Sequence, residues 1–373
     1  MVIELPYGRA PLRVDLGNRD VEVVEVAALP SPAPLNHLLD DALAAAPIAL
    51  NPGARVTVIV SDPTRAEPRA AFLAALDRRL PGVRWTVAVA TGTHGPCKVD
   101  ALGIAVPPGL VNHDGHAPAD LVELGTTAYG TPVRVHRCVL EADLVVCTGC
   151  IRPHYFAGFG AGAKAIFPGL GEATAIRINH RLKTAPGARA GIVDGNPCRA
   201  DLEEAVRMVP TTKLLVNGVT GPDGQIHAVV AGDLERAFRA GCDLARPWFT
   251  VRAKPAPVVI ASDALPVTAS LYQASKIAAA TAPFVEPGGV LVVAAECVDG
   301  VGPLDTVNEA ILRIGILPRL PAGARLILVS GLAKAVVDQT LVEYGVDVAS
   351  AIGQTSRIVV VPKASQLLCE PWT

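Results

Sequence analysis

The chain has 373 residues, of which 50% are hydrophobic and 18% charged, and its formal net charge is −2. That length suits two domains with a core each, and the composition excludes a disordered chain. Because Lys and Arg are not concentrated in any segment, we expect neither a nucleic-acid partner nor binding to an anionic membrane surface. No secretory signal and no apolar run of membrane-spanning length is recognisable, so we expect a cytoplasmic location.

The first part of the chain repeats one pattern, in which an apolar run is followed by a polar loop and a helical stretch. The runs at 56–60, 85–90 and 143–147 predict buried strands. A helix with Pro68 in its first turn is predicted after the first of them. Fully apolar strands that alternate with helices indicate an α/β domain with a mostly parallel sheet.

The pattern restarts after a Pro-rich stretch at 252–257, which predicts a linker. Further apolar runs lie at 258–261, 290–295, 325–329 and 358–361. We therefore predict a cofactor-binding α/β domain over residues 1–252 and a smaller α/β domain over 258–373. In an alternative version of this prediction, the last residues of the chain pack back on the first domain. A cleft between the two domains is the default position for the active site.

Polar side chains collect where the predicted strands of the first domain end. Asp62 and Arg65 follow the first strand, His94 follows the second and His154 follows the third. In parallel sheets the ligand crevice lies beyond the carboxyl ends of the strands. These three loops are therefore predicted to bring their side chains to one site.

A glycine-rich stretch from Pro153 to Lys164 is the most unusual segment of the chain. Glycines let a backbone approach a ligand closely, and a lysine after them suggests a phosphate site. The spacing is not that of a P-loop, since Ala165 stands where Ser or Thr is required. Lys164 could instead be a nucleophile or Schiff-base lysine. A flexible surface turn with a solvated lysine is the competing interpretation.

Three histidines in or beside these loops could carry chemistry. His94 and His154 suit general acid–base work, and a pair of histidines fits inversion at carbon, which needs access to both faces. His180 falls in a predicted helix and could ligate a metal. Because it lacks a partner at ligand spacing, the residues alone favour an ordinary surface or core histidine there.

Two further pairs of residues each allow a functional interpretation and an ordinary structural one. Gln273 and Lys276 are three residues apart on a predicted helix, so they share a face and could hold a carboxylate; an ordinary solvated face is the alternative. Cys147 and Cys150 form the only C-x-x-C. No second pair completes a zinc site, and Cys147 ends an apolar run, so a small core residue is the favoured interpretation.

Taken together and in order, these segments resemble the nickel-dependent lactate racemase family over about residues 55–300. The matching segments are Ser61-Asp62-Pro63-Thr64-Arg65, Ala90-Thr91-Gly92-Thr93-His94, Pro153-His154-Tyr155-Phe156-Ala157-Gly158-Phe159 with Lys164 and Pro168-Gly169, Asn179-His180, and Tyr272-Gln273 with Lys276. The block from Pro153 to Lys164 is the most specific of them.

The resemblance implies a nickel-pincer nucleotide, a pyridinium mononucleotide with thioamide and thiocarboxylate arms that clamp nickel. By position, Lys164 would form the covalent thioamide link and His180 would be the protein ligand to nickel. The loop formed by Asp62, Pro63, Thr64 and Arg65 would lie around the nucleotide. Separate maturation proteins would supply this cofactor, and the substrate would be a small 2-hydroxy acid.

The resemblance also implies a racemase or epimerase reaction. One of His94 and His154 would take the hydroxyl proton while hydride leaves the substrate carbon, and the other would donate a proton when hydride returns to the opposite face. Arg65 and Lys276 would hold the carboxylate and Gln273 would orient the substrate. Gly95 and the pair Gly160-Ala161 depart from the usual family pattern. The substrate could therefore be larger than lactate or differently charged.

Three alternatives remain open at the level of sequence. An NAD-type 2-hydroxy acid dehydrogenase would need a G-x-G-x-x-G after a strand with an acidic residue about 20 positions on, and the chain has none. A non-catalytic, two-lobed organic-acid-binding protein would not need so many His, Lys and Arg at strand ends. A family member that binds the nucleotide without a covalent link would not need Lys164.

Overall fold

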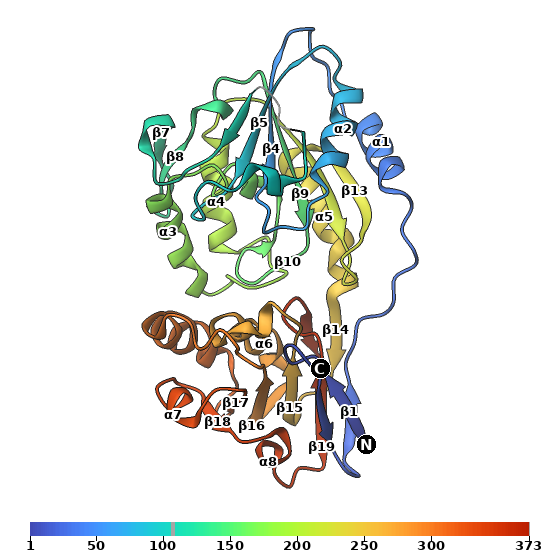
Figure 1. Ribbon diagram of the computed structural model, residues 1–373, viewed down its shortest axis with the longest axis vertical. Coiled ribbons are helices and arrows are strands. Elements are labelled where there is room, and N and C mark those ends of the chain that lie inside the picture. The colour runs from blue at the N-terminus through green and yellow to red at the C-terminus, as the bar shows by residue number, and fades with distance from the viewer. Residues whose placement is uncertain (106–108, 373) are drawn as a thin grey trace. The chain divides into compact units, whose positions relative to one another are not determined.

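The computed structural model describes residues 1–105 and 109–372, which form two compact units. Unit 2 consists of Leu29–Trp248, and unit 1 combines Met1–Ala28 with Phe249–Thr373. Each unit has a six-stranded sheet flanked by helices (Figure 1). The predicted class, α/β with mostly parallel sheets, is confirmed.

The sheet of unit 2 has the strand order β13-β12-β9-β4-β5-β6. Only the edge strand β13 runs antiparallel to its neighbour β12. Its strands are β4 (Arg55–Ser61), β5 (Arg84–Ala90), β6 (Leu110–Asn112), β9 (Leu144–Ile151), β12 (Lys213–Thr220) and β13 (Ile226–Asp233). The three apolar runs predicted as strands form β4, β5 and β9, so their polar ends open at one edge of the sheet.

Helices cover both faces of this sheet because its strands are apolar on both sides. Leu39 of α1 and Phe72 of α2 share a core with Val58 and Val87 on one face. On the other face, Gly241 of α5 lies close to Ile151 of β9. The helices of unit 2 are α1 (Leu35–Ala45), α2 (Arg69–Arg79), α3 (Ala173–Arg181), α4 (Pro197–Arg207) and α5 (Leu234–Phe249). Two hairpins complete the unit, β7 (Leu121–Thr126) with β8 (Pro132–His136) and β10 (Pro153–His154) with β11 (Gly158–Phe159).

The sheet of unit 1 is parallel throughout, with the order β18-β17-β16-β15-β19-β3. Its strands are β3 (Asp20–Val23), β15 (Ala256–Ser262), β16 (Val285–Ala294), β17 (Arg325–Val329), β18 (Glu343–Gly345) and β19 (Arg357–Val361). One face packs against α6 (Leu271–Thr281) and the π-helix Thr306–Ile316. The other packs against α8 (Val348–Ile352) and the hairpin of β1 (Val2–Leu5) and β2 (Leu12–Asp15). A short helix, α7 (Lys334–Val337), follows β17.

The division between the units differs from the predicted domains 1–252 and 258–373. Residues Met1–Ala28 fold with the C-terminal part of the chain, because β3 extends the sheet beside β19 and Leu5 is buried among Val258 and its neighbours. The predicted linker at 252–257 lies largely in strands, since β14 (Thr250–Ala253) and β15 are separated only by Lys254 and Pro255. The last strand, β20 (Leu368–Pro371), pairs with β14 inside unit 1 rather than packing on the N-terminal domain.

No helix in the described part of the chain combines the length and apolar character needed to cross a membrane.

A buried carboxylate, Asp201 of α4, ties three segments of unit 2 together. It accepts hydrogen bonds from the hydroxyl groups of Thr127 and Thr131, in the β7–β8 turn, and from the side-chain amide of Asn179 at 2.7 Å. Asn179 lies on α3 and directly precedes His180. Asp201 is fully buried, so its charge depends on these donors for solvation.

We expect the Asp201→Ala substitution to lower the free energy of unfolding by about 3 kcal/mol or more, because it leaves three buried donors without an acceptor. Asp120→Ala, which removes an exposed carboxylate paired with Arg137, should cost less than about 1 kcal/mol. Urea denaturation of both variants measures the difference. Equal stability of the two variants would show that the Asp201 network does not hold these segments together.

Candidate active site

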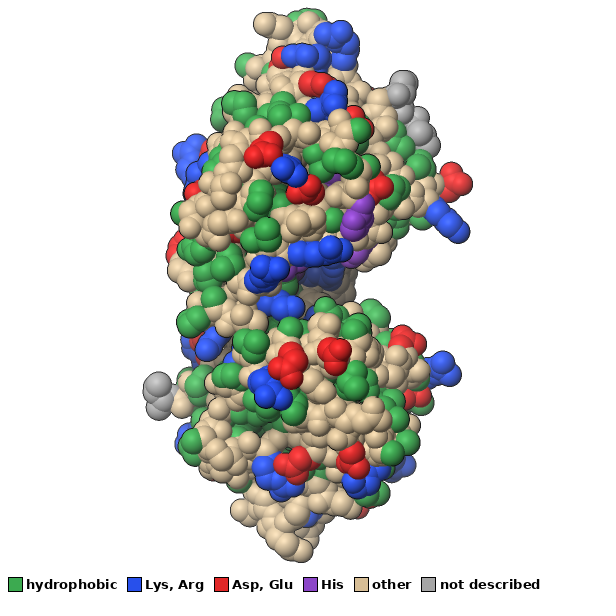
Figure 2. Space-filling view, turned by 90° about the vertical axis from the view of Figure 1, so that its left-hand side faces the viewer, with side chains coloured by type: hydrophobic (Ala, Val, Ile, Leu, Met, Phe, Trp, Pro, Cys, Tyr) green, Lys and Arg blue, Asp and Glu red, His purple; other side chains and the backbone are tan. Residues whose placement is uncertain are grey.

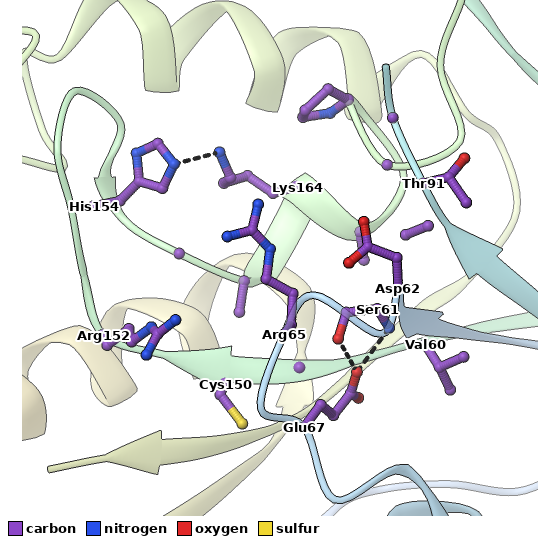
Figure 3. A pocket seen from close by; sticks show the side chains of 18 of the residues that line it. Val60, Ser61, Asp62, Arg65, Glu67, Thr91, Cys150, Arg152, His154 and Lys164 are labelled. Atoms are coloured by element: carbon purple, nitrogen blue, oxygen red, sulfur yellow. Dashed lines mark hydrogen bonds between the residues drawn. The ribbon is translucent and has the colours of Figure 1, made fainter. Parts of the chain in front are cut away.

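A pocket of about 400 Å³ lies at the carboxyl ends of β4, β5 and β9, within unit 2. Its lining includes all the residues that the sequence placed at strand ends, namely Asp62, Arg65, His94 and His154, together with Lys164 and His180. The pocket thus brings these six residues together although Asp62 and His180 are 118 positions apart in the sequence. Figure 3 shows several of these side chains around it.

The loop after β4 is held by a buried arginine at the start of α2. The guanidinium group of Arg69 donates to the backbone carbonyls of Ser61, Asp62 and Arg65. Glu67 accepts from the backbone and hydroxyl of Ser61 and from the hydroxyl of Thr148 on β9. The predicted cofactor loop 62–65 is therefore anchored through its backbone, which leaves the Arg65 side chain exposed at the pocket.

Asp62 orients the first of the two histidines. Its Oδ2 lies 2.7 Å from Nδ1 of His94, and its Oδ1 accepts from the backbone N–H of Thr64 at 3.0 Å. Burial acts to raise the pKa of Asp62, but the hydrogen bonds from Thr64 and His94 outweigh it and hold the pKa below its usual value. The carboxylate therefore accepts a hydrogen bond from the N–H at Nδ1, and in the neutral ring Nε2 carries the lone pair.

His154 and Lys164 form the second reactive pair, joined by 3.3 Å between Nε2 and Nζ (Figure 3). The backbone N–H of Ala157 donates to Nδ1 of His154, so in the neutral ring the proton is on Nε2 and points at Nζ. Nζ can accept a hydrogen bond from it only as a neutral amine. Desolvation, with the nearby charges of Arg199 and Arg65, lowers the pKa of Lys164 to about 7. Desolvation and the charge of Lys164 also lower the pKa of His154 well below its usual value.

The glycine-rich loop that carries Lys164 is fitted tightly to its surroundings. Gly162 has a φ of +66°, and a Cβ atom there would lie 2.5 Å from a ring carbon of Phe238. Its backbone N–H donates to the side-chain oxygen of Asn217 on β12 at 3.0 Å. A glycine is therefore required at 162 by both backbone conformation and space, and the surface-turn interpretation of this segment is wrong.

Sequence reasoning missed the residue beneath this loop, Arg199 of α4. It is 1% exposed, donates to the carbonyls of Ala157 and Phe159, and lies 4.3 Å from the ring centroid of Phe238. Its only ion pair among the described residues is with Glu203, at 3.9 Å. No local signal could have revealed it, because its partners are backbone carbonyls about 40 positions earlier.

His180 lies at the end of α3, with its ring edge-on to that of Phe156 at a centroid distance of 5.2 Å. Desolvation and the positive charges of Lys164 and Lys183 lower its pKa to about 3, so the imidazole is neutral at physiological pH. Neutral imidazole is the form that binds a metal. Among the residues that the structure describes, no group of three or more His, Cys, Asp or Glu side chains could hold a metal ion by itself.

Gln273 and Lys276 lie on α6 of unit 1. Ser270 caps the helix by accepting from the backbone N–H of Gln273, and Nζ of Lys276 donates to Oε1 of Gln273 at 2.5 Å. The prediction that the two residues share one helix face is confirmed. Their binding of a substrate, and the predicted cleft between domains, stay predictions.

The two cysteines of the C-x-x-C have different surroundings. Cys147 is completely buried in β9, and desolvation raises the pKa of its thiol to about 12, which confirms the interpretation as a core residue. Cys150 lines the pocket. All eight cysteines are free, so this pair is not a disulfide.

A family model described as the lactate racemase N-terminal domain matches residues 7–191 of the chain. A lactate racemase of Thermoanaerobacterium thermosaccharolyticum is 30% identical over 331 residues, which cover 80% of this chain and 75% of the relative. A lactate racemase of Lactiplantibacillus plantarum is 31% identical over 262 residues, or 66% of this chain and 61% of that protein.

Two solved structures share the fold. The lactate racemase apoprotein from T. thermosaccharolyticum aligns with a TM-score of 0.83 and 24% identity, covering 99% of this chain and 100% of that one. A protein from Thermotoga maritima aligns with a TM-score of 0.66 and 16% identity, covering 91% and 97%. On the strength of the sequence relatives, the chain belongs to the lactate racemase family of isomerases.

Proposed function

We propose that this protein racemises or epimerises a 2-hydroxy acid in the pocket of unit 2. The observation that carries the proposal is the pair of histidines with complementary tautomers in one pocket. Nε2 of His94 carries a lone pair because Nδ1 faces Asp62, and Nε2 of His154 carries a proton because Nδ1 accepts from Ala157. Nε2 of His94 can thus accept a proton from a ligand hydroxyl, while the Nε2–H of His154 can donate a hydrogen bond to a ligand oxygen.

The residues present fit a covalently attached nickel-pincer nucleotide. The pKa of Lys164 is lowered to about 7, so its amine is partly neutral at physiological pH. Lys164 lines a pocket of about 400 Å³, a volume within the range of small-ligand sites. His180 offers one neutral imidazole, and the described residues supply no complete metal cage, so a group that brings its own metal ligands suits the site. When bound, the cofactor would supply an acceptor for the hydride that leaves the substrate carbon.

The protein's own side chains would move the protons. His94 takes the proton of the substrate hydroxyl as hydride leaves C2, which yields a planar 2-oxo acid. When hydride returns to the opposite face, the imidazolium form of His154 gives its Nε2 proton to the carbonyl oxygen, and the inverted 2-hydroxy acid forms with His94 protonated and His154 neutral. The covalent link would remove the charge of Lys164, which adds to desolvation in lowering the pKa of His154. In the reverse direction the two histidines exchange roles. Asp62 stabilises the His94 imidazolium that exists between the two steps.

The loop 62–65 and the glycine-rich loop would surround the nucleotide, and Arg65 would hold the substrate carboxylate. Arginine suits this task because its planar fork binds both carboxylate oxygens. Gln273 and Lys276 of α6 would complete the substrate site, with the lysine as a second positive charge and the glutamine as the orienting amide. Production of the active enzyme would depend on cofactor maturation proteins.

The first prediction concerns loading. Protein made together with pincer-cofactor maturation enzymes should show a nucleotide-sized mass increase and bound nickel, because Lys164 provides the attachment point. Lys164→Ala should show neither, whereas Lys254→Ala, which changes an exposed lysine of unit 1, should load normally. Intact mass and nickel content measure both. An unmodified, nickel-free wild type from a host that matures a known family member would rule out the covalent cofactor.

The second prediction uses the pKa of Lys164 in the unloaded protein. Because the pKa is lowered to about 7, the amine is half neutral at pH 7 and loses its proton as the pH rises through that value. An unperturbed lysine is neutral in only about one molecule in 2,500 at that pH. Acetylation followed by peptide mass spectrometry should show a half-maximal rate for Lys164 near pH 7. A rate that keeps rising up to pH 10 would contradict the lowered pKa.

The third prediction concerns the histidines of the loaded enzyme. His94→Ala and His154→Ala should each reduce kcat at least about 100-fold in both directions, since each histidine is base one way and acid the other. His116→Ala serves as the matched control, because His116 is exposed and does not line the pocket. Kinetics from the pure D and pure L substrates give both directions. Full activity of either variant in either direction would refute the assignment.

A further inference from the structure

Arg152, in the short connection between β9 and β10, is a positive charge that the proposed reaction does not use. Its side chain is partly buried and lines the pocket. The guanidinium group makes no hydrogen bond or ion pair with the part of the chain that the structure describes. Partial burial and the neighbouring charge of Arg65 lower its pKa, although arginine remains charged at any physiological pH. A partly desolvated cation without an acceptor is costly unless a ligand supplies one.

Arg65 presents a second guanidinium group to the same space. It lies in the loop after β4, while Arg152 lies in the connection after β9, and both line the pocket (Figure 3). Neither of the pocket's two acidic side chains, Asp62 and Glu67, forms an ion pair with Arg65 or Arg152. Asp62 is engaged by His94 and Thr64, and Glu67 is engaged by Ser61 and Thr148. The space-filling view likewise shows Lys and Arg side chains gathered beside histidine on one face of unit 2 (Figure 2).

We propose that Arg152 forms a subsite for a second oxyanion, beside the substrate carboxylate assigned to Arg65, and that this oxyanion takes no part in the bond changes. Two guanidinium groups that line one pocket and lack acceptors among the described residues can bind two oxyanions, because each planar fork can donate two hydrogen bonds to a carboxylate or phosphate. The anion would also screen the repulsion between the two arginines. The subsite is separate from the histidine pair and from Lys164 in its chemistry, because arginine does not exchange protons at neutral pH.

Two sources could supply this oxyanion, and both rest on the proposed function. The first is a second carboxylate on the substrate, which would make the protein selective for 2-hydroxy dicarboxylic acids over lactate. The second is the phosphate group of the nucleotide. In the first case the loss of Arg152 changes which substrate is used, and in the second it changes how much cofactor is retained.

The experiment compares wild type, Arg152→Gln and Arg236→Gln, the last changing an exposed arginine of α5 that does not line the pocket. Calorimetry on the unloaded proteins measures binding of inorganic phosphate and of succinate. Intact mass then measures cofactor loading after co-production with maturation enzymes. Finally, kcat/KM is measured for inversion of lactate and of 2-hydroxysuccinate.

We expect Arg152→Gln to weaken binding of at least one of the two anions about 10-fold or more, and Arg236→Gln to leave it unchanged. Normal loading with a selective loss of kcat/KM on 2-hydroxysuccinate would assign the anion to the substrate. Reduced loading would assign it to the nucleotide phosphate. Anion binding, loading and substrate preference that all match wild type would overturn the subsite. A loaded wild type that inverts no 2-hydroxy acid would overturn the proposed function instead, and the calorimetry would still decide the subsite.

Discussion

The geometry of the pocket depends on Arg199, a buried guanidinium that is bound almost entirely by backbone. It donates to the carbonyls of Ala157 and Phe159 and so holds the β10–β11 segment that places His154. Its charge also reaches the reactive groups, since it helps to lower the pKa of Lys164 and of His154. A single buried cation therefore helps to fix the position of this wall of the pocket, and its charge adds to desolvation in favouring the neutral forms of His154 and Lys164. A neutral amine is the form of lysine that can make a covalent bond.

The facing wall is built by the same means. Arg69 donates to the backbone carbonyls of Ser61, Asp62 and Arg65, at the end of β4 and in the loop after it. The loop held in this way presents Asp62 to His94 and leaves Arg65 facing the pocket. Backbone carbonyls cannot move independently of the chain, so a guanidinium group that gathers several of them fixes a loop more firmly than side-chain contacts alone. His94 and His154 thus each lie in a wall of the pocket that is held by a buried arginine, Arg69 or Arg199.

His94 and His154 differ in the charges that surround them. His94 has a carboxylate partner and is half exposed, with 52% of its side chain accessible, whereas His154 is partly buried among cations. The carboxylate can stabilise an imidazolium at His94, while the cations favour the neutral ring at His154. In the proposed reaction this asymmetry would make His94 the readier base, although inversion would need each histidine to act as base in one direction and as acid in the other. Arg65 and Arg152 add positive charge to the pocket, where they would bind the anionic parts of the ligands.

The sequence alone determined the α/β class and the positions of the site loops, because buried parallel strands are marked by continuous apolar runs and their ends by polar residues. Asp62, His94 and His154 could be placed at one edge for that reason, and Lys164 was marked by the glycines before it. Local pattern did not reveal that Met1–Ala28 belongs to the C-terminal unit, because β3 pairs with β19 across more than 300 positions. Nor could it reveal Arg199, Asp201 or the free guanidinium of Arg152. Only the tertiary structure decided which buried charges find partners, since partner choice depends on distance in space and on desolvation, neither of which a local pattern records.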